Sequence, residues 1–313
     1  MKIQFLGTSS GSPSVFRNVS ATAIGFDKSK EWLLVDCGEG SQHQVLKSQY
    51  TAYHLGTICI THTHGDHCYG LPGLLASMSM SGRKAAVNLV APKQVIEFVH
   101  NAIQLTDLSL GFDLHTHIIE ALNNKLDFDD FAIEIIKLQH RVPSYGFKIT
   151  EKCIPNKLRF NKLTQQGIPS GPHFNQLQRG FDVNFSGKLL SAKEYTYPSW
   201  RPRVIIVCGD NEKPALLKPY IVGVDVVVHE ATFTQSDLHK VGIHTGHSDA
   251  KRVAEFAQQC QIPLLVLFHF SVRYHGVGQL DKLRQEAATY YDGQLLLAED
   301  FESVSVAKHF SQQ

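Results

Sequence analysis

The feature that most restricts the fold is a series of short apolar runs, rich in β-branched and aromatic residues and separated by turn-forming residues. Such runs predict β-strands, and they lie at 2–7, 22–26, 32–38, 57–61, 87–92, 131–140, 204–210, 225–232, 263–269 and 302–307. Between some of them, apolar residues recur at helical spacing, at 71–80, 93–105, 248–259 and 279–291. Clustered strands with interspersed helices predict an α/β fold in which two sheets carry helices on their outer faces.

The length and composition indicate one large folded unit. A chain of 313 residues with 43% hydrophobic and 19% charged residues can bury a large core, and folds of this size often form one domain. The formal net charge of +1 provides no overall attraction for nucleic acid, so a polyanion site must come from local clusters of Lys and Arg. We therefore expect one domain, 1–313, with an insertion.

Other features predict a soluble protein of the cytoplasm. The six cysteines show neither a C-x-x-C pair nor the spacing of a disulfide scaffold, which is typical of reduced thiols. The N-terminal MKIQFLGTSSG has too short an apolar run for a signal peptide. No apolar run approaches the length that spans a bilayer.

Residues 151–200 interrupt the regular succession of strands and helices. Seven Lys and Arg stand there against three acidic residues, and the segment GIPSGP at 167–172 cannot continue a helix. We interpret the region as an inserted, protruding basic arm. The alternative is a solvated loop whose charge has no partner.

The segment ICITHTHGDHCYGLPGLL at 58–75 carries the clearest chemical signal. His62, His64, Asp66 and His67 fall within six residues of the end of an apolar run. With 17 His and 29 Asp plus Glu in the chain, such a pattern arises by chance at odds of roughly one in a few hundred. A histidine-rich surface loop is therefore a weak explanation.

Other histidines and aspartates share this position at the end of a strand. His140, Asp210 and His269 each end an apolar run, and loops at one sheet edge can bring distant side chains together. Any one of them could be an ordinary hydrogen-bonded residue, but the shared placement indicates a metal site. Seven imidazoles and carboxylates are too many for one four-coordinate ion and suit two ions about 3.5–4 Å apart. The turn at Gly65 would let His62 and His64 serve one ion while the other two residues of the motif serve the second.

Here the sequence resembles a known family. THTHGDH followed by YGLPGLL resembles the short form of ribonuclease Z, a tRNA 3′-processing endonuclease of the metallo-β-lactamase superfamily. The resemblance extends over the chain in FLGTSSGSP, DCGEGSQHQ, HEAT, GHS and HFSVRY. It implies a four-layer αββα sandwich, a tRNA-binding arm at 151–198, precursor tRNA as substrate and a homodimer. The expected activity is removal of the 3′ trailer, which leaves a 3′ hydroxyl on the tRNA.

The resemblance also implies roles for single residues. His62, His64 and His140 would bind one zinc ion; Asp66, His67 and His269 would bind the second; Asp210 would bridge both. Asp66 would also act as general base, and His247, paired with Glu230, would protonate the leaving oxygen. The substrate-binding residues expected by the same resemblance are Arg17, Asn18, Arg273 and Tyr274.

The chain departs from the family pattern at three positions. Val15 replaces the usual lysine before Arg17, Asn211 follows Asp210 where a threonine is usual, and Asp249 stands after Ser248 in place of a hydroxyl residue. None removes a ligand, so they concern substrate preference more than catalysis. Two other functions stay open: another dinuclear-zinc hydrolase of the superfamily, such as a cyclic-nucleotide phosphodiesterase or a thioesterase, and a binding protein without catalysis.

Overall fold

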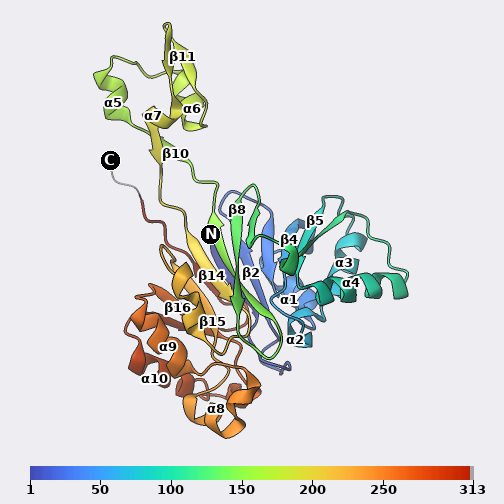
Figure 1. The fold of residues 1–313 in the computed structure, drawn as a ribbon. Helices are drawn as coiled ribbons and strands as arrows, with labels where there is room; N and C mark the ends of the chain where they lie inside the picture. The colour runs from blue at the N-terminus through green and yellow to red at the C-terminus, as the bar shows by residue number, and fades with distance from the viewer. Residues whose placement is uncertain (311–313) are drawn as a thin grey trace.

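Two seven-stranded sheets form the centre of the computed structural model, which describes residues 1–310 (Figure 1). The first sheet has the order β18 (Ser303–Ser305), β1 (Lys2–Gly7), β2 (Ala21–Gly25), β3 (Trp32–Val35), β4 (Leu55–Cys59), β5 (Val87–Ala91), β6 (Leu114–Ile118). The second has the order β17 (Gln294–Leu297), β16 (Leu264–Phe268), β15 (Val226–Glu230), β14 (Val204–Cys208), β9 (Ser144–Glu151), β8 (Phe131–Leu138), β7 (Lys125–Asp127).

Helices cover the outer face of each sheet. The helices near the first sheet are α1 (Ser41–Lys47), α2 (Gly65–Cys68), α3 (Leu71–Met80) and α4 (Lys93–Leu105). Those near the second are α8 (Gln235–Val241), α9 (Ala250–Gln259) and α10 (Asp281–Tyr290). Short 3₁₀ turns lie at Ala52–His54, Ile119–Ala121, Pro214–Tyr220, Ile243–Thr245 and Val272–Tyr274. The predicted α/β fold of four layers, αββα, is confirmed.

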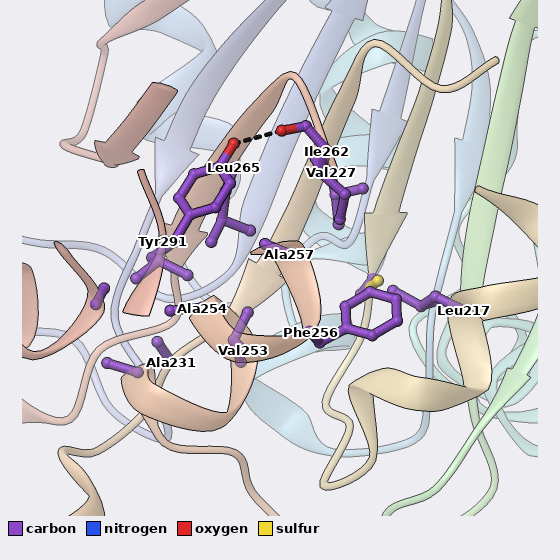
Figure 2. Close-up of a cluster of buried hydrophobic side chains, with 14 of the residues drawn as sticks. Leu217, Val227, Ala231, Val253, Ala254, Phe256, Ala257, Ile262, Leu265 and Tyr291 are labelled. Carbon is purple, nitrogen blue, oxygen red and sulfur yellow. Dashed lines mark hydrogen bonds between the residues drawn. The ribbon is translucent and has the colours of Figure 1, made fainter. Parts of the chain in front are cut away.

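Three apolar clusters hold the layers together. One lies between the sheets and includes Phe5 and Phe147, and a second joins the first sheet to α3 and α4. The third packs Val253 and Phe256 of α9 beside Val227 and other side chains of the second sheet (Figure 2). Both faces of β4, β14 and β15 are buried, which explains why these strands are apolar runs without polar alternation.

The expected helices and most expected strands are present. The two helices predicted at 71–80 and 93–105 have those bounds. The helix predicted at 248–259 begins at Ala250 because Asp249 caps it, its side chain accepting a hydrogen bond from the Arg252 backbone N–H at 2.8 Å. The sequence did not predict β6, β7, β9 or β17, which are short or carry polar residues within the strand.

The direction of the strands decides where the polar loops meet. β14, β15 and β16 are parallel neighbours, and β8 runs in the same direction because β9 is antiparallel to both β8 and β14. In the first sheet, β3, β4 and β5 are parallel. The residues that follow these strands therefore gather at one edge of the sandwich.

The basic segment forms a unit that stands away from the sandwich (Figure 1). It contains β10 (Asn156–Leu158), α5 (Phe160–Gln165), α6 (Pro172–Gln178), β11 (Val183–Phe185), β12 (Lys188–Leu190), α7 (Ala192–Tyr195) and β13 (Thr196–Pro198). A small core of its own includes Leu163, Phe174 and Tyr195. We call residues 156–198 the arm; Glu151 belongs to β9.

A buried ion pair marks the base of the arm. Arg203 is 2% exposed, and its Nε donates to Glu151 at 2.9 Å. Trp200 Nε1 donates to the same carboxylate at 3.1 Å. Among the described residues, no helix is both long and apolar enough to cross a membrane.

Candidate metal centre

The predicted metal ligands come from both sheets and meet at one edge. His62 follows β4, and His64 to His67 lie at or within α2. His140, Asp210 and His269 follow β8, β14 and β16. A cleft of about 350 Å³ opens beside them, and its lining includes His64, Asp66, Asp210, His247 and His269.

Gly65 lies where the chain enters a helix, and the motif residues before and after it fall in different candidate ligand groups, as the sequence predicted. It is the first residue of α2, and a Cβ atom at this position would lie 2.1 Å from the ring of Tyr69. The absence of a side chain therefore lets the Tyr69 ring lie against the start of the helix.

The seven predicted ligands fall into two groups, and a third group of candidate ligand atoms, from Asp210, His247 and His269, overlaps both. His62, His64, His140 and Asp210 make up one, and Asp66, His67 and His269 make up the other. In the first group, His64 Nδ1 lies 3.1 Å from His62 Nε2 and 3.2 Å from His140 Nε2. In the second, the Nε2 atoms of His67 and His269 are 3.2 Å apart, and Asp66 Oδ2 lies 3.4 Å from His269 Nε2. The structure thus brings together all seven predicted residues.

Asp210 lies between the two groups. Its Oδ2 is 3.7 Å from His62 Nε2 and 3.6 Å from His140 Nε2. Its Oδ1 is 3.3 Å from His269 Nε2 and 3.6 Å from that of His67. Oδ1 is buried and has no hydrogen-bond partner among the described residues. Because a buried carboxylate needs compensation, the unpaired oxygen among imidazoles fits a bound cation.

Hydrogen bonds from outside the cluster orient the imidazoles. His67 Nδ1 lies 2.7 Å from Asp36 Oδ2, and His140 Nδ1 donates to the Gly246 carbonyl at 2.7 Å. His269 Nδ1 lies 3.1 Å from Thr232 Oγ1. These contacts occupy Nδ1 of the His67, His140 and His269 rings and leave their Nε2 atoms facing the centre. This is the arrangement of metal-binding histidines.

The electrostatics of the cluster favour positive charge at its centre. Burial lowers the pKa of His62 well below its usual value, which keeps the ring neutral. Burial opposes protonation of His67 too, but nearby carboxylates, Asp66 most strongly, raise its pKa well above the usual value. The pKa of Asp66 is itself lowered: burial opposes this, but His67 and His269 outweigh it. The carboxylates therefore stabilise whatever cation lies among them.

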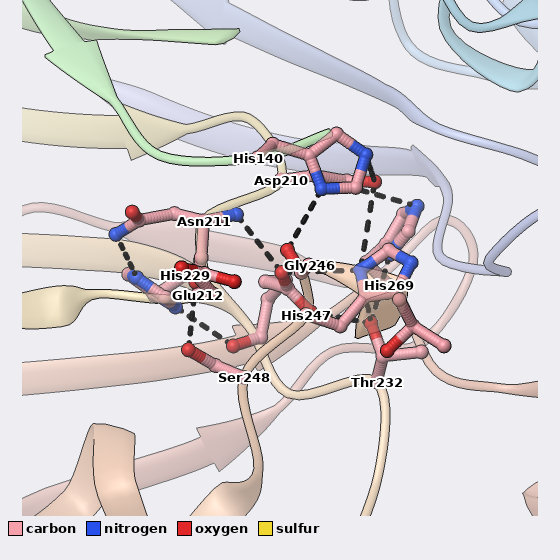
Figure 3. Close-up of polar contacts among 12 residues, drawn as sticks. His140, Asp210, Asn211, Glu212, His229, Thr232, Gly246, His247, Ser248 and His269 are labelled. Carbon is pink, nitrogen blue, oxygen red and sulfur yellow. Dashed lines mark hydrogen bonds and ion pairs between the residues drawn. The ribbon is translucent and has the colours of Figure 1, made fainter. Parts of the chain in front are cut away.

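His247 and Glu230 form a pair at the side of this cluster (Figure 3). His247 Nδ1 lies 3.2 Å from Glu230 Oε1 and 3.6 Å from Asp210 Oδ2. Burial lowers the pKa of His247, but the two carboxylates outweigh it and raise the value to about 9. With Nδ1 directed at Glu230, Nε2 is the ring nitrogen left for a substrate.

The four predicted substrate-binding residues differ in their exposure and in their hydrogen-bond partners. The guanidinium of Arg17 donates to Thr8 Oγ1 and to the Ala298 carbonyl, both at 2.7 Å. Tyr274 is 2% exposed and its hydroxyl donates to Asp237 at 2.7 Å. Asn18 Nδ2 donates to the Glu39 carbonyl at 2.9 Å, whereas Arg273 is exposed and its guanidinium lies 5.0 Å from the Phe233 ring centre. Contact of these four with substrate stays a prediction.

Two residues of the site were not predicted from the sequence. Asp36 holds His67 and accepts hydrogen bonds from Thr61, and Thr232 contacts both His269 and His247. Asp36 follows the apolar run WLLV and so shares the strand-end position of His62, His140, Asp210 and His269. That signal could have identified it. Thr232 carries no comparable signal.

Comparison with known proteins first gives the fold. A metallo-β-lactamase-fold protein from Bacillus subtilis, YhfI, has a TM-score of 0.66 at 18% identity and covers 97% of this chain and 98% of its own. The family model described as Anti-Pycsar protein Apyc1 matches residues 1–160, which include β1 to β9 and the histidine motif. The chain is a metallo-β-lactamase-fold protein.

Closer relatives give the family. A ribonuclease Z of Pseudomonas putida is 43% identical over 313 residues, 99% of this chain and 98% of the relative. One from Halalkalibacterium halodurans is 36% identical over 96% of this chain and 97% of the relative. The solved structure of the short form of human tRNase Z has a TM-score of 0.69 at 27% identity and covers 98% of this chain and all of its own. The chain belongs to the ribonuclease Z family.

The contact between Asp36 and His67 gives a first prediction. Asp36→Asn should lower the affinity for metal on the order of 10–100-fold, because the amide orients the imidazole less firmly and makes it a poorer donor. Competition with a chelator measures this affinity. Asp129→Asn, an exposed substitution far along the chain, serves as the control. Equal metal affinities in the two variants would show that Asp36 does not support metal binding by His67.

Proposed function

We propose that this chain is a dinuclear-zinc endoribonuclease that removes the 3′ trailer from precursor tRNA and leaves a 3′ hydroxyl on the tRNA. The observation that carries the proposal is the pairing of His247 with Glu230 beside a seven-ligand cluster, in a chain that matches ribonuclease Z over nearly its full length. A cluster of metal-ligand side chains alone would suit many hydrolases, but a reaction with a poor leaving group also needs an acid.

The donor set supports zinc in both groups. Imidazoles and carboxylates are the ligands that zinc accepts, and His62, His64 and His140 would hold one ion while Asp66, His67 and His269 hold the other. The two oxygens of Asp210 face different groups, as a bridging ligand requires. Zinc ions held there would lower the pKa of a bound water toward about 7 and would offset the negative charge that develops on the phosphate.

The side chains of the protein supply the proton transfers. Asp66 is ionised, and its Oδ2 accepts a hydrogen bond from the Gly11 backbone N–H at 2.7 Å, so it can accept the proton of the attacking water. As the bond between that water and phosphorus forms, the bond between phosphorus and the 3′ oxygen breaks. His247 donates the proton from Nε2 to that oxygen, and Glu230 stabilises the charged imidazole at Nδ1.

The positive charge of the arm is an argument for a large polyanionic substrate. Of its basic residues, only Lys162 forms an ion pair within residues 1–310, with Glu194 at 2.6 Å. Arg159 lies over Tyr197, and Lys188 donates to Gln166. The remaining positive charge is available to phosphates. We infer that the arm, residues 156–198 of the predicted insertion 151–198, binds tRNA outside the cleft. We also infer that the protein acts as a homodimer and works in the cytoplasm.

The second candidate is another dinuclear-zinc hydrolase of the superfamily, acting on a cyclic nucleotide or a thioester. The match of residues 1–160 to a differently named family favours keeping it in the test. This second function gives no reason for the arm or for an acid beside the cluster. Turnover of a 3′-extended tRNA precursor, compared with turnover of a small phosphodiester, distinguishes the two.

We predict two zinc ions per chain. Asp210→Ala should lower the occupancy of both, because one carboxylate faces both groups. Elemental analysis of the purified protein measures this, with the exposed Asp113→Ala as a control. One ion in the unmodified protein, or two in the Asp210 variant, would contradict the proposal.

Substitution of His247 should affect only substrates with a poor leaving group. His247→Ala should reduce turnover of precursor tRNA on the order of 10²–10⁴-fold, and reduce turnover of a nitrophenyl phosphodiester far less, because nitrophenolate leaves without protonation. Glu230→Gln should show the same pattern more mildly. His244→Ala, exposed three residues earlier, is the control. Equal loss on both substrates, or loss of metal, would make His247 a ligand or a structural residue.

Removal of the arm should weaken binding without affecting the chemistry. Pro155 and Ser199 are joined by a backbone hydrogen bond of 2.9 Å, so residues 156–198 can be replaced by a short linker that leaves the Glu151–Arg203 pair in place. This variant should bind tRNA more weakly, with a flatter salt dependence, yet hydrolyse a nitrophenyl phosphodiester normally.

A second variant controls for the loss of structure in that deletion. Replacing Arg179, Lys188 and Lys193 with Gln keeps the arm and removes charge, and it should reproduce part of the loss in tRNA binding. If the deletion slows both substrates equally, the arm supports the fold of the sandwich and not the binding of RNA.

A further inference from the structure

Two buried residues beside the acid pair have no part in the mechanism described above. His229 is fully buried at the end of β15, and Asn211 is fully buried in the loop after β14. Neither offers an atom to the ligand groups. Asn211 Nδ2 lies 3.0 Å from His229 Nε2, and Figure 3 shows the two side chains directed at each other.

The hydrogen bonds fix the tautomer of His229. Its Nδ1 lies 2.7 Å from the Glu230 carbonyl, which can only accept, so Nδ1 carries the proton. Nε2 is then an acceptor and receives the N–H of the Asn211 amide. Burial lowers the pKa of His229, which agrees with a neutral ring.

The orientation of the Asn211 amide is fixed at both ends. With Nδ2 donating to His229, Oδ1 accepts from the backbone N–H groups of Gln139 and Lys213, both at 3.2 Å. The Asn211 side chain therefore ties the end of β15 to the residue before His140.

The backbone of Asn211 contacts the acid pair directly. Its N–H donates to Glu230 Oε1 at 2.9 Å, the same oxygen that lies 3.2 Å from His247 Nδ1. Its carbonyl accepts from Ser248 Oγ at 2.6 Å. One residue thus links the loops that carry His140, Asp210, Glu230 and His247.

We propose that Asn211 and His229 are positioning residues that act through Glu230 to direct His247 at the leaving oxygen. The His229–Asn211 hydrogen bond holds the Asn211 backbone where its N–H orients the Glu230 carboxylate. Because the network is neutral, it fixes geometry without adding charge to the metal centre. The inference rests on the proposed function, since it assigns the pair a task only if His247 is the acid.

Non-additivity tests the proposal. Asn211→Ala should lower kcat for precursor tRNA about 10–100-fold, the scale of losing an orienting partner, with KM and zinc content unchanged and a much smaller effect on a nitrophenyl phosphodiester. In a His247→Ala background, the same substitution should cause no further loss, because residues that act as one unit do not add. A further loss of the same size in the double variant would overturn the proposal.

Substitutions at His229 provide the rescue. His229→Leu fills the space but removes the acceptor, whereas His229→Gln can place an oxygen where Nε2 accepts from Asn211. Gln should therefore retain more kcat for tRNA than Leu at equal thermal stability, and equal kcat values would overturn the proposal. If either His229 variant fails to fold, the Asn211→Ala cycle still decides the proposal.

The two hypotheses fail in different ways. If the unmodified enzyme does not cut precursor tRNA at the 3′ end, the proposed function is wrong. If it does cut there, and Asn211→Ala slows good and poor leaving groups alike or removes zinc, only the positioning role is wrong.

Discussion

The carboxylate of Asp210 lies buried where the two sheets meet, with one oxygen that no group within residues 1–310 hydrogen-bonds. Leaving such a charge uncompensated would destabilise a fold by several kcal/mol. Four imidazoles from three segments of the chain surround it, those of His62 and His67 after β4, His140 after β8 and His269 after β16. The arrangement at this edge of the sandwich is therefore organised around positive charge, and the loops that end its strands take their shape from that requirement.

The groups around the cluster fall into two kinds. Charged partners, such as Asp36 beside His67, tune how strongly a ligand donates. Neutral partners, such as Thr232 and Asn211, decide only where a ring or a carboxylate points. Backbone geometry contributes too, because Asp36 and His269 both have positive φ values, 60° and 59°. Residues other than glycine rarely adopt this conformation, and it persists where the surrounding contacts enforce it.

The sequence predicted the parts of this structure that depend on local pattern. Apolar runs identified β4, β14, β15 and β16, because strands buried on both faces consist mostly of apolar residues. The strand-end position found His140 and Asp210. The apolar pattern did not identify β9, because Lys148 and Glu151 interrupt its run. The partners that neutralise these two charges, Glu134 and Arg203, are brought near them only by folding. Thr232 could not be found, because its role depends on two histidines brought near it only by folding.

The predicted ligands that meet at this edge come from both halves of the sandwich. His62, Asp66 and His67 belong to loops of the first sheet, and His140, Asp210 and His269 to loops of the second. A cation bound among them is consequently a crosslink between the sheets, comparable to a disulfide placed across two layers. Its binding free energy adds to the free energy of unfolding, as for any ligand that binds only the folded state. The apolar cluster between the sheets holds the body of the sandwich together, and a cation bound at this edge would join the two sheets there.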